Sequence, residues 1–149
     1  MAYHYRDSGL DNVYLENGYT VHQTPYGEGI SIANTAKLHR LIGDWLVSLP
    51  KALTGAELRF LRLELELTQR DLAAMLNQQE QAVRRWEKYR NKEINGSADY
   101  LLRALYKEYT GGDGSVRRMV DRLAELNVVE KPQVWLREID DHWNVALEA

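Results

Sequence analysis

The chain has 149 residues, of which 44% are hydrophobic and 28% charged, and its formal net charge at pH 7 is -3. This length and composition are typical of a globular protein with one substantial core. The chain contains no cysteine, which excludes disulfides and thiolate zinc sites and permits a reducing environment. No signal peptide or run of about 18 apolar residues is visible, so we expect a cytoplasmic protein with no membrane span.

Basic residues are concentrated in one short segment. Residues 51–109 hold 11 lysines and arginines against 9 acidic residues, whereas acidic residues are in excess on both sides. The stretch RRWEKYRNK, Arg84 to Lys92, has five basic residues and one glutamate. Because salt screens charge effects beyond about 10 Å, a local basic ridge suits an anionic partner at one surface. A solvated helix face is the alternative interpretation of the charge pattern.

The first 50 residues combine strand and helix patterns. VYLENGYTVHQ alternates apolar and polar residues around Asn17-Gly18, a dipeptide that supplies the positive φ angles of a tight hairpin turn. We therefore predict strands at about 13–16 and 19–23, with a short strand in GISIA. A helix follows in TAKLHRLIGDWLVSL and ends at Pro50. Its apolar positions at helical spacing are Leu38, Leu41, Ile42, Trp45, Leu46 and Leu49.

Four further helices are predicted between residues 54 and 109. Thr54 and Glu57 have the spacing of a capping box, in which each side chain satisfies a backbone N–H group of the other residue. Thr68 and Asp71 repeat this signal before a very short helix that stops at Asn77. A third helix runs from about residue 79 to 88, and a fourth begins at residue 97. The apolar residues expected to face inward are Leu58, Leu61, Leu65, Leu72, Ala73, Leu76, Val83, Trp86, Leu101, Leu102 and Leu105.

The last 40 residues are predicted to form one more helix, followed by a tail whose secondary structure is ambiguous. Three glycines, Gly111, Gly112 and Gly114, break the chain before the amphipathic segment SVRRMVDRLAELN. The tail QVWLREIDDHWNVAL fits either a hairpin that turns at Asp140-Asp141 or one more helix, and the hairpin is favoured.

Residues 67–89 carry a resemblance to a known family. Leu67-Thr68-Gln69, Leu72-Ala73, Val83 and Arg85-Trp86-Glu87 resemble the pattern L-T-Q-x-x-L-A, followed by (V/I)-x-x-W-E-x-G, of lambda-repressor-like (Xre/Cro) helix-turn-helix regulators. The resemblance extends over residues 54–109. It implies a mainly α protein with small β appendages (α+β), in which residues 51–110 form a helix-turn-helix bundle. Residues 1–50 would then form a β-hairpin and helix, and residues 111–149 a helix and the hairpin of the tail.

The resemblance also implies roles for individual residues. Arg62 and Glu87 are implied to form a structural ion pair. Ala73 is implied to be small because the recognition helix crosses close to it. The exposed N-terminal half of helix 79–88 is implied to enter the DNA major groove. There a Gln side chain can form two hydrogen bonds with adenine, and an Arg side chain can form two with guanine. The implied base contacts are Gln81, Arg84 and Glu80, the last either accepting from a cytosine amine or excluding wrong sites. The implied backbone contacts are Gln69, Gln79, Arg85, Lys88, Arg90 and Lys92. For Gln79, capping of the helix is the alternative role.

Two positions depart from the family pattern. Asn77 replaces the glycine of the turn, a mild change because Asn tolerates the left-handed conformation. Tyr89 replaces the glycine that closes the recognition helix, so this helix is expected to run longer or to end differently.

Two functions fit these features. The first is a homodimeric transcriptional regulator, most simply a repressor, that binds double-stranded DNA and dimerises through its appendages. The second is an antitoxin-type protein that binds and neutralises a toxin protein through the appendages, with DNA autoregulation secondary. Nothing in the sequence indicates catalysis or a metal site, because the histidines are scattered and the serines lack a paired base. We therefore expect no enzyme activity and no cofactor.

Overall fold

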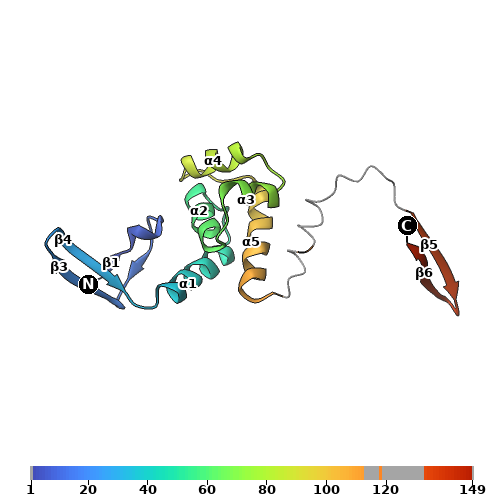
Figure 1. The fold of residues 1–149 in the computed structure, drawn as a ribbon, viewed down its shortest axis with the longest axis horizontal. Helices are drawn as coiled ribbons and strands as arrows, with labels where there is room; N and C mark the ends of the chain where they lie inside the picture. The colour runs from blue at the N-terminus through green and yellow to red at the C-terminus, as the bar shows by residue number, and fades with distance from the viewer. Residues whose placement is uncertain (1, 113–117, 119–132, 149) are drawn as a thin grey trace.

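The computed structural model describes residues 2–112, 118 and 133–148 (Figure 1). These residues form a mixed α+β structure with five α-helices and three two-stranded antiparallel sheets. The helix expected at residues 115–127 falls outside the described residues, apart from Arg118. The elements in chain order are β1 (Tyr3–His4), the 3-10 helix η1 (Arg6–Ser8), β2 (Tyr14–Leu15), β3 (Tyr19–Thr24), β4 (Gly27–Ile32), α1 (Thr35–Ser48), α2 (Gly55–Glu64), α3 (Gln69–Met75), α4 (Glu80–Lys88), α5 (Gly96–Gly111), β5 (Val134–Ile139) and β6 (His142–Glu148).

The predicted hairpin around Asn17-Gly18 is wrong in its pairing. Strand β2 pairs with β1, and β3 pairs with β4 across a turn at Pro25-Tyr26. Gly18 does adopt a positive φ of 82°. The physical reason lies in the core, because Val13 and Leu15 are buried and hold β2 against the helices, away from β3. Strand β3 then takes its partner from the following residues.

The predicted helix starts are confirmed in the middle of the chain. The Thr54 side chain accepts from Glu57 N, and the Glu57 carboxylate accepts from Thr54 N, as expected of a capping box. Thr68 accepts from Asp71 N at the start of α3. At the start of α5, the Asn95 side chain accepts from two backbone N–H groups. Local side-chain hydrogen bonds therefore set where α2, α3 and α5 begin.

One buried cluster joins all five helices and the N-terminal segment. Helices α1, α2 and α5 pack on one another, and α4 packs on both α2 and α3. In α1, whose apolar residues recur at helical spacing as expected, Ile42 and Leu46 are buried, but Leu41 and Trp45 are 67% and 42% exposed. The neighbouring helices therefore cover only a narrow stripe of α1.

The connection between α1 and α2 is fastened to α5 by polar contacts. Asp99 is 3% exposed, and its carboxylate accepts from Leu53 N at 2.8 Å and pairs with Arg103. Arg103 also donates to the carbonyl oxygens of Val47 and Leu49, at 3.1 and 2.8 Å. These contacts satisfy the carbonyl groups at the end of α1 and fix the position of α2, on which α4 rests.

The tail forms the predicted hairpin, and the helical alternative is wrong. Strands β5 and β6 are antiparallel, with Ile139 opposite His142 at the turn. Asp140 and Asp141 both have positive φ, 52° and 63°, which suits a two-residue turn between twisted strands. The register changes once, between Trp135 and Leu136.

Candidate nucleic-acid interface

Helices α3 and α4 are joined by a short turn over residues 76–79. Asn77 has a φ of 54°, so it adopts the left-handed conformation expected where the family pattern has glycine. Gln78 N donates to Ala73 O at 2.8 Å, and Asn77 N donates to Ala74 O at 3.2 Å. These bonds satisfy carbonyl groups at the end of α3 and turn the chain sharply into α4.

The inner side of α4 is anchored in the core. Val83 is fully buried, and Leu72 and Ala73 of α3 are buried beneath it, as predicted. Trp86 is half-buried and packs against the same cluster. The small side chain of Ala73 suits this crossing, because a larger residue would push α3 and α4 apart.

The predicted ion pair between Arg62 and Glu87 is present. Arg62 Nε and Nη2 donate to the two carboxylate oxygens of Glu87 at 2.8 and 2.9 Å, and Arg62 Nη1 donates to Leu67 O at 2.9 Å. The two side chains are only 11% and 6% exposed. One guanidinium thus ties α2 to α4 and to the start of α3, which fixes the orientation of α4.

Helix α4 ends at Lys88, and Tyr89 leaves the helical conformation with φ -93° and ψ 66°. The ring of Tyr89 lies under two cations, 5.7 Å from Lys88 Nζ and 5.1 Å from Lys92 Nζ. Replacing the usual glycine by Tyr89 therefore does not extend the helix. Instead, the residues after α4 pair with the start of α2, where Gly55 N donates to Lys92 O at 3.0 Å.

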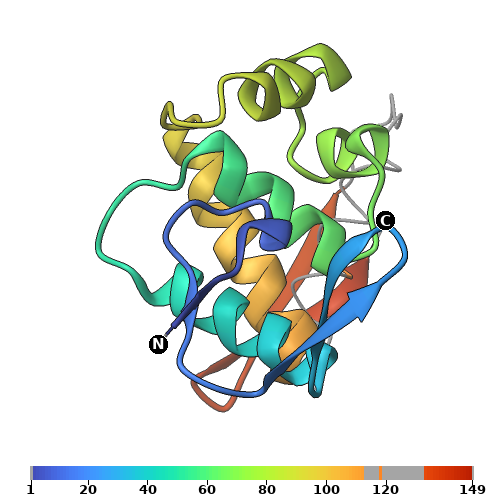
Figure 2. The same cartoon turned by 90° about the vertical axis from the view of Figure 1, so that its left-hand side faces the viewer.

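The outer side of α4 carries a stripe of one amide and three cations. Gln81, Arg84, Arg85 and Lys88 are all exposed. Their spacing of three, four and seven residues places them on one face of the helix. Figure 1 and Figure 2 both show α4 at the edge of the helical body, with its outer side away from α2 and α3. We call these four residues the α4 stripe.

Glu80 is paired with Arg84, the first cation of the stripe. Arg84 Nη2 donates to Glu80 Oε1 at 2.7 Å, and the two side chains are 60% and 37% exposed. The sequence carried a signal for this pair in the opposite charges four residues apart. The contact joins two of the three residues that the resemblance assigns to DNA bases, and it holds the Arg84 guanidinium along the helix.

The residues assigned to the DNA backbone are spread more widely. Gln79 is exposed at the N-cap of α4, and Gln69 is half-buried at the first position of α3. Lys92 is exposed in the segment after α4. Arg90 points to the N-terminal segment, where its Nη2 donates to Gly9 O at 2.8 Å and Asp11 Oδ1 at 3.1 Å. Sequence reasoning missed these two contacts, which span 81 and 79 residues.

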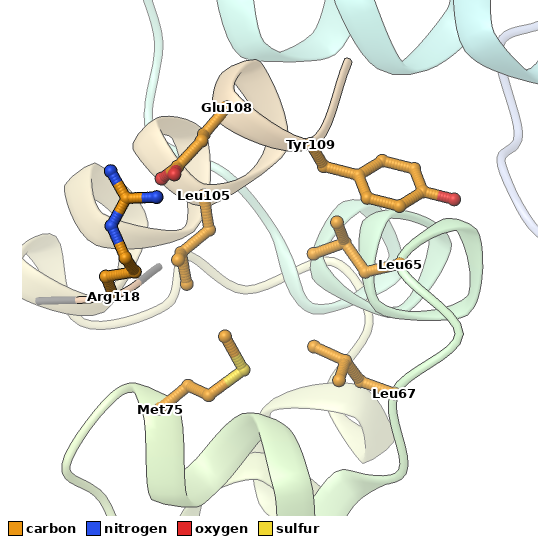
Figure 3. A pocket seen from close by; sticks show the side chains of 7 residues that line it. All are labelled: Leu65, Leu67, Met75, Leu105, Glu108, Tyr109 and Arg118. Atoms are coloured by element: carbon orange, nitrogen blue, oxygen red, sulfur yellow. The ribbon is translucent and has the colours of Figure 1, made fainter. Parts of the chain in front are cut away.

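Two other features lie outside the α4 stripe. Tyr5 Oη, His39 Nε2 and Nδ1, and Glu64 Oε1 form a chain of hydrogen bonds of 2.7 and 2.8 Å that links the N-terminal segment to α1 and α2. Burial raises the pKa of Tyr5, with a smaller contribution from Asp7. A hollow of about 280 Å³ lies where α2, α3 and α5 meet. Figure 3 shows its lining of Leu65, Leu67, Met75, Leu105, Glu108, Tyr109 and Arg118.

Comparisons with protein-family models, with curated proteins and with solved structures found no match to this chain. Among the described residues, no three His, Asp or Glu side chains gather in a group that could hold a metal ion. No helix in residues 2–112 or 133–148 is long and apolar enough to cross a membrane. The arrangement of α3 and α4 is therefore the feature from which a function can be argued.

Proposed function

We propose that this chain is a sequence-specific DNA-binding transcriptional regulator of the cytoplasm that reads the major groove with α4. The observation that carries the proposal is the α4 stripe, defined above as Gln81, Arg84, Arg85 and Lys88. In its simplest form the regulator is a dimeric repressor that blocks access to a promoter. The helix-turn-helix fold of the lambda-repressor-like family is part of this proposal, and α3 and α4 would be its two helices.

The shape of the site supports the proposal. An α-helix with its side chains is about 10–12 Å wide, and the major groove of B-DNA is about 12 Å wide. Helix α4 lies at the edge of the body, so its outer side can approach a groove (Figure 1). The Arg62–Glu87 pair fixes the inner side, so the stripe is presented in one orientation.

The chemistry of the stripe supports it as well. Gln81 can pair with both polar atoms of an adenine edge, and Arg84 with both acceptors of a guanine edge. Arg85 and Lys88 would add phosphate contacts, each of which releases counterions and makes binding sensitive to salt. Glu80 holds one side of the Arg84 guanidinium, so it favours one direction of that side chain over others.

The proposal is tested by selecting tight-binding DNA from a random pool and titrating the winners by fluorescence anisotropy. We expect a twofold-symmetric winner that is bound far more tightly than bulk DNA and weakens steeply between about 50 and 200 mM salt. The double variant Gln81→Ala/Arg84→Ala should lose roughly 100-fold in affinity for the winner, since each base contact contributes about 1–3 kcal/mol. Both residues are exposed, so the variant should fold.

A matched control uses an exposed amide and an exposed cation elsewhere. Gln23 lies on β3 and Lys37 on α1, and both are exposed. Gln23→Ala/Lys37→Ala should bind the winner like the unchanged protein. The proposal fails if no sequence is enriched, or if the α4 double variant binds the winner as well as the control does.

An antitoxin-type role, in which the chain neutralises a protein partner, is the second candidate. It is favoured by exposed aromatic residues near the N-terminus, since Tyr14 on β2 is 61% exposed and Tyr26 in the turn between β3 and β4 is 99% exposed. On this hypothesis, Tyr14→Ala abolishes the biological effect while the α4 double variant leaves neutralisation intact. Growth of cells that express the chain with the product of a neighbouring gene would separate the two functions.

A further inference from the structure

Helix α4 is followed directly by a tight turn that is fastened to the start of α2. Lys92 N donates to Tyr89 O at 3.0 Å and closes the turn. Gly55 N, at the start of α2, donates to Lys92 O at 3.0 Å. These backbone hydrogen bonds hold the turn in one position beside the end of α4.

Arg90, inside the turn, adds further anchors. Its carbonyl oxygen accepts from Ala56 N at 3.0 Å. Its Nη2 donates to Gly9 O at 2.8 Å and to Asp11 Oδ1 at 3.1 Å. The turn is therefore held from two sides, by α2 and by the N-terminal segment.

The held turn presents one aromatic ring together with two cations. Lys88 Nζ lies 5.7 Å and Lys92 Nζ 5.1 Å from the centroid of the Tyr89 ring, within the range of cation–π attraction. The tyrosine is 46% exposed, and both lysines are exposed. We call these three residues the Tyr89 cluster.

The positive charge of the Tyr89 cluster is not offset by a carboxylate. Arg84 pairs with Glu80, and Arg90 pairs with Asp11. Neither lysine of the cluster forms an ion pair within the described part of the chain. Two like charges beside one ring repel each other, and an anion bound next to both would offset that repulsion. The cluster is therefore suited to an anionic ligand.

We propose that the Tyr89 cluster is a clamp for the phosphates of duplex DNA, in which Tyr89 is the positioning residue for the two lysines. Lys88 also belongs to the α4 stripe, so the clamp extends the proposed DNA site beyond the end of the helix. The inference rests on the proposed function and deepens it, because it assigns the group that holds the DNA backbone beside α4. Phosphate contacts carry no sequence information, so the clamp adds affinity for any duplex.

The ring contributes by organising the lysines before DNA binds. A lysine side chain has many rotamers, and fixing it on binding costs conformational entropy. Over the Tyr89 ring, the two ammonium groups are already gathered, so part of this cost is removed. The backbone does not select the side chain here, because the φ of -93° does not require the glycine of the family pattern.

The test titrates the full chain with a duplex of arbitrary sequence, and with any selected sequence, by fluorescence anisotropy at several salt concentrations. Lys88→Gln/Lys92→Gln should reduce the slope of log affinity against log salt by roughly two, since each phosphate contact contributes about 0.9. Tyr89→Leu keeps both charges, so it should lower the affinity roughly fivefold with little change in the slope. Tyr89→Phe restores the ring and should restore the affinity.

A double-mutant cycle shows whether the ring acts through the lysines. In the Lys88→Gln/Lys92→Gln background, Tyr89→Leu should cause no further loss of affinity. If the ring only supported the fold of the turn, Tyr89→Leu would cost the same in both backgrounds. Circular dichroism checks that each variant keeps the helical body.

Matched controls lie elsewhere on the helical body. Tyr100 is 76% exposed on α5, and Lys37 on α1 and Lys107 on α5 are also exposed. Tyr100→Leu and Lys37→Gln/Lys107→Gln should leave the affinity and the salt slope unchanged, because salt screens charges far from the bound DNA.

The outcomes separate the clamp from sequence-specific reading. A selected sequence whose salt slope is unchanged in Lys88→Gln/Lys92→Gln, or an equal loss for Tyr89→Leu in both backgrounds, would overturn the clamp while α4 still reads DNA. Enrichment of no sequence, with binding to the arbitrary duplex that depends on the clamp, would support the clamp and overturn sequence-specific reading. A protein that binds no duplex at low salt would overturn both.

Discussion

The helical body α1–α5 and the hairpin β5–β6 both have regularly spaced apolar residues, but they differ in what covers them. Leu58, Leu61 and Leu102 in the body are fully buried by neighbouring helices. Leu136 and Trp143 in the hairpin are 57% and 70% exposed. A helix in the body packs on several others, whereas β5 and β6 mainly contact each other among the described elements. The difference indicates that contacts among the helices stabilise the body, whereas the apolar side chains of the hairpin stay exposed in the described structure.

The largest expected effect on the free energy of unfolding distinguishes a buried leucine of the body from an exposed leucine of the hairpin. Leu61→Ala removes a fully buried side chain and should lower the free energy of unfolding by about 4 kcal/mol. Leu136→Ala removes an exposed side chain of the same chemistry and should change the unfolding of the helical body by less than about 0.5 kcal/mol. Urea titration followed by helical circular dichroism measures both. Equal losses would mean that the hairpin is part of the folded body.

The next largest expected effect on stability distinguishes the arginine that pairs with the inner side of α4 from an arginine on its outer side. Arg62→Ala would leave the buried Glu87 carboxylate without its bidentate partner and should destabilise the protein by about 3 kcal/mol. Arg84→Ala breaks an exposed pair with Glu80 and should change stability by about 0.5 kcal/mol or less. The same urea titration tests this prediction. A loss for Arg84→Ala as large as that for Arg62→Ala would contradict the distinction between the inner and outer sides of α4.

A somewhat smaller effect on stability is expected when the first glycine of α2, rather than that of α5, is replaced by alanine. A Cβ atom on Gly55 would lie 1.7 Å from Trp86 O, which is backbone and cannot swing away. Gly55→Ala should therefore separate α2 from α4 and destabilise the protein by roughly 2–3 kcal/mol. Gly96 begins α5 with nothing within 4 Å of such an atom, so Gly96→Ala should be neutral or slightly stabilising. Thermal unfolding would reveal the difference, and similar melting temperatures would argue against close packing of α2 on α4.

The smallest effect concerns pH. Burial, with a smaller contribution from Asp44, raises the pKa of Tyr106 from 10.0 to about 12. The folded state therefore holds this proton more tightly than the unfolded state. Its contribution to stability is complete below pH 10 and is lost as the pH rises from about 10 to about 12. Tyr106→Phe should flatten this fall by on the order of 1–2 kcal/mol in urea titrations at successive pH values. The control is Tyr26→Phe, at a 99% exposed position, which should leave the pH profile unchanged.

Features set by near neighbours could be predicted from the sequence. The helix caps at Thr54 and Thr68, the left-handed Asn77 and the turn at Asp140-Asp141 depend on residues within a few positions of one another. The Arg62–Glu87 pair spans 25 residues, and it was predicted only because the spacing of the motif resembles a known family. The i,i+4 pair of Glu80 and Arg84 could have been predicted from the sequence in the same way as the caps.

Features set by packing between distant segments could not be predicted. Which strand pairs with β3, which side of α1 is covered, and where Arg90 points all depend on how the N-terminal segment lies on the helices. The sequence by itself determined the starts of α2 and α3 and the stripe on α4, and it favoured the tail hairpin, because capping, turn chemistry and periodicity are local. The tertiary structure alone decided that Leu41 and Trp45 are exposed, that Arg90 bonds to Asp11 and that Leu136 and Trp143 are exposed in the described structure. The physical reason is that burial depends on what surrounds a residue in space, and a local pattern does not contain that information.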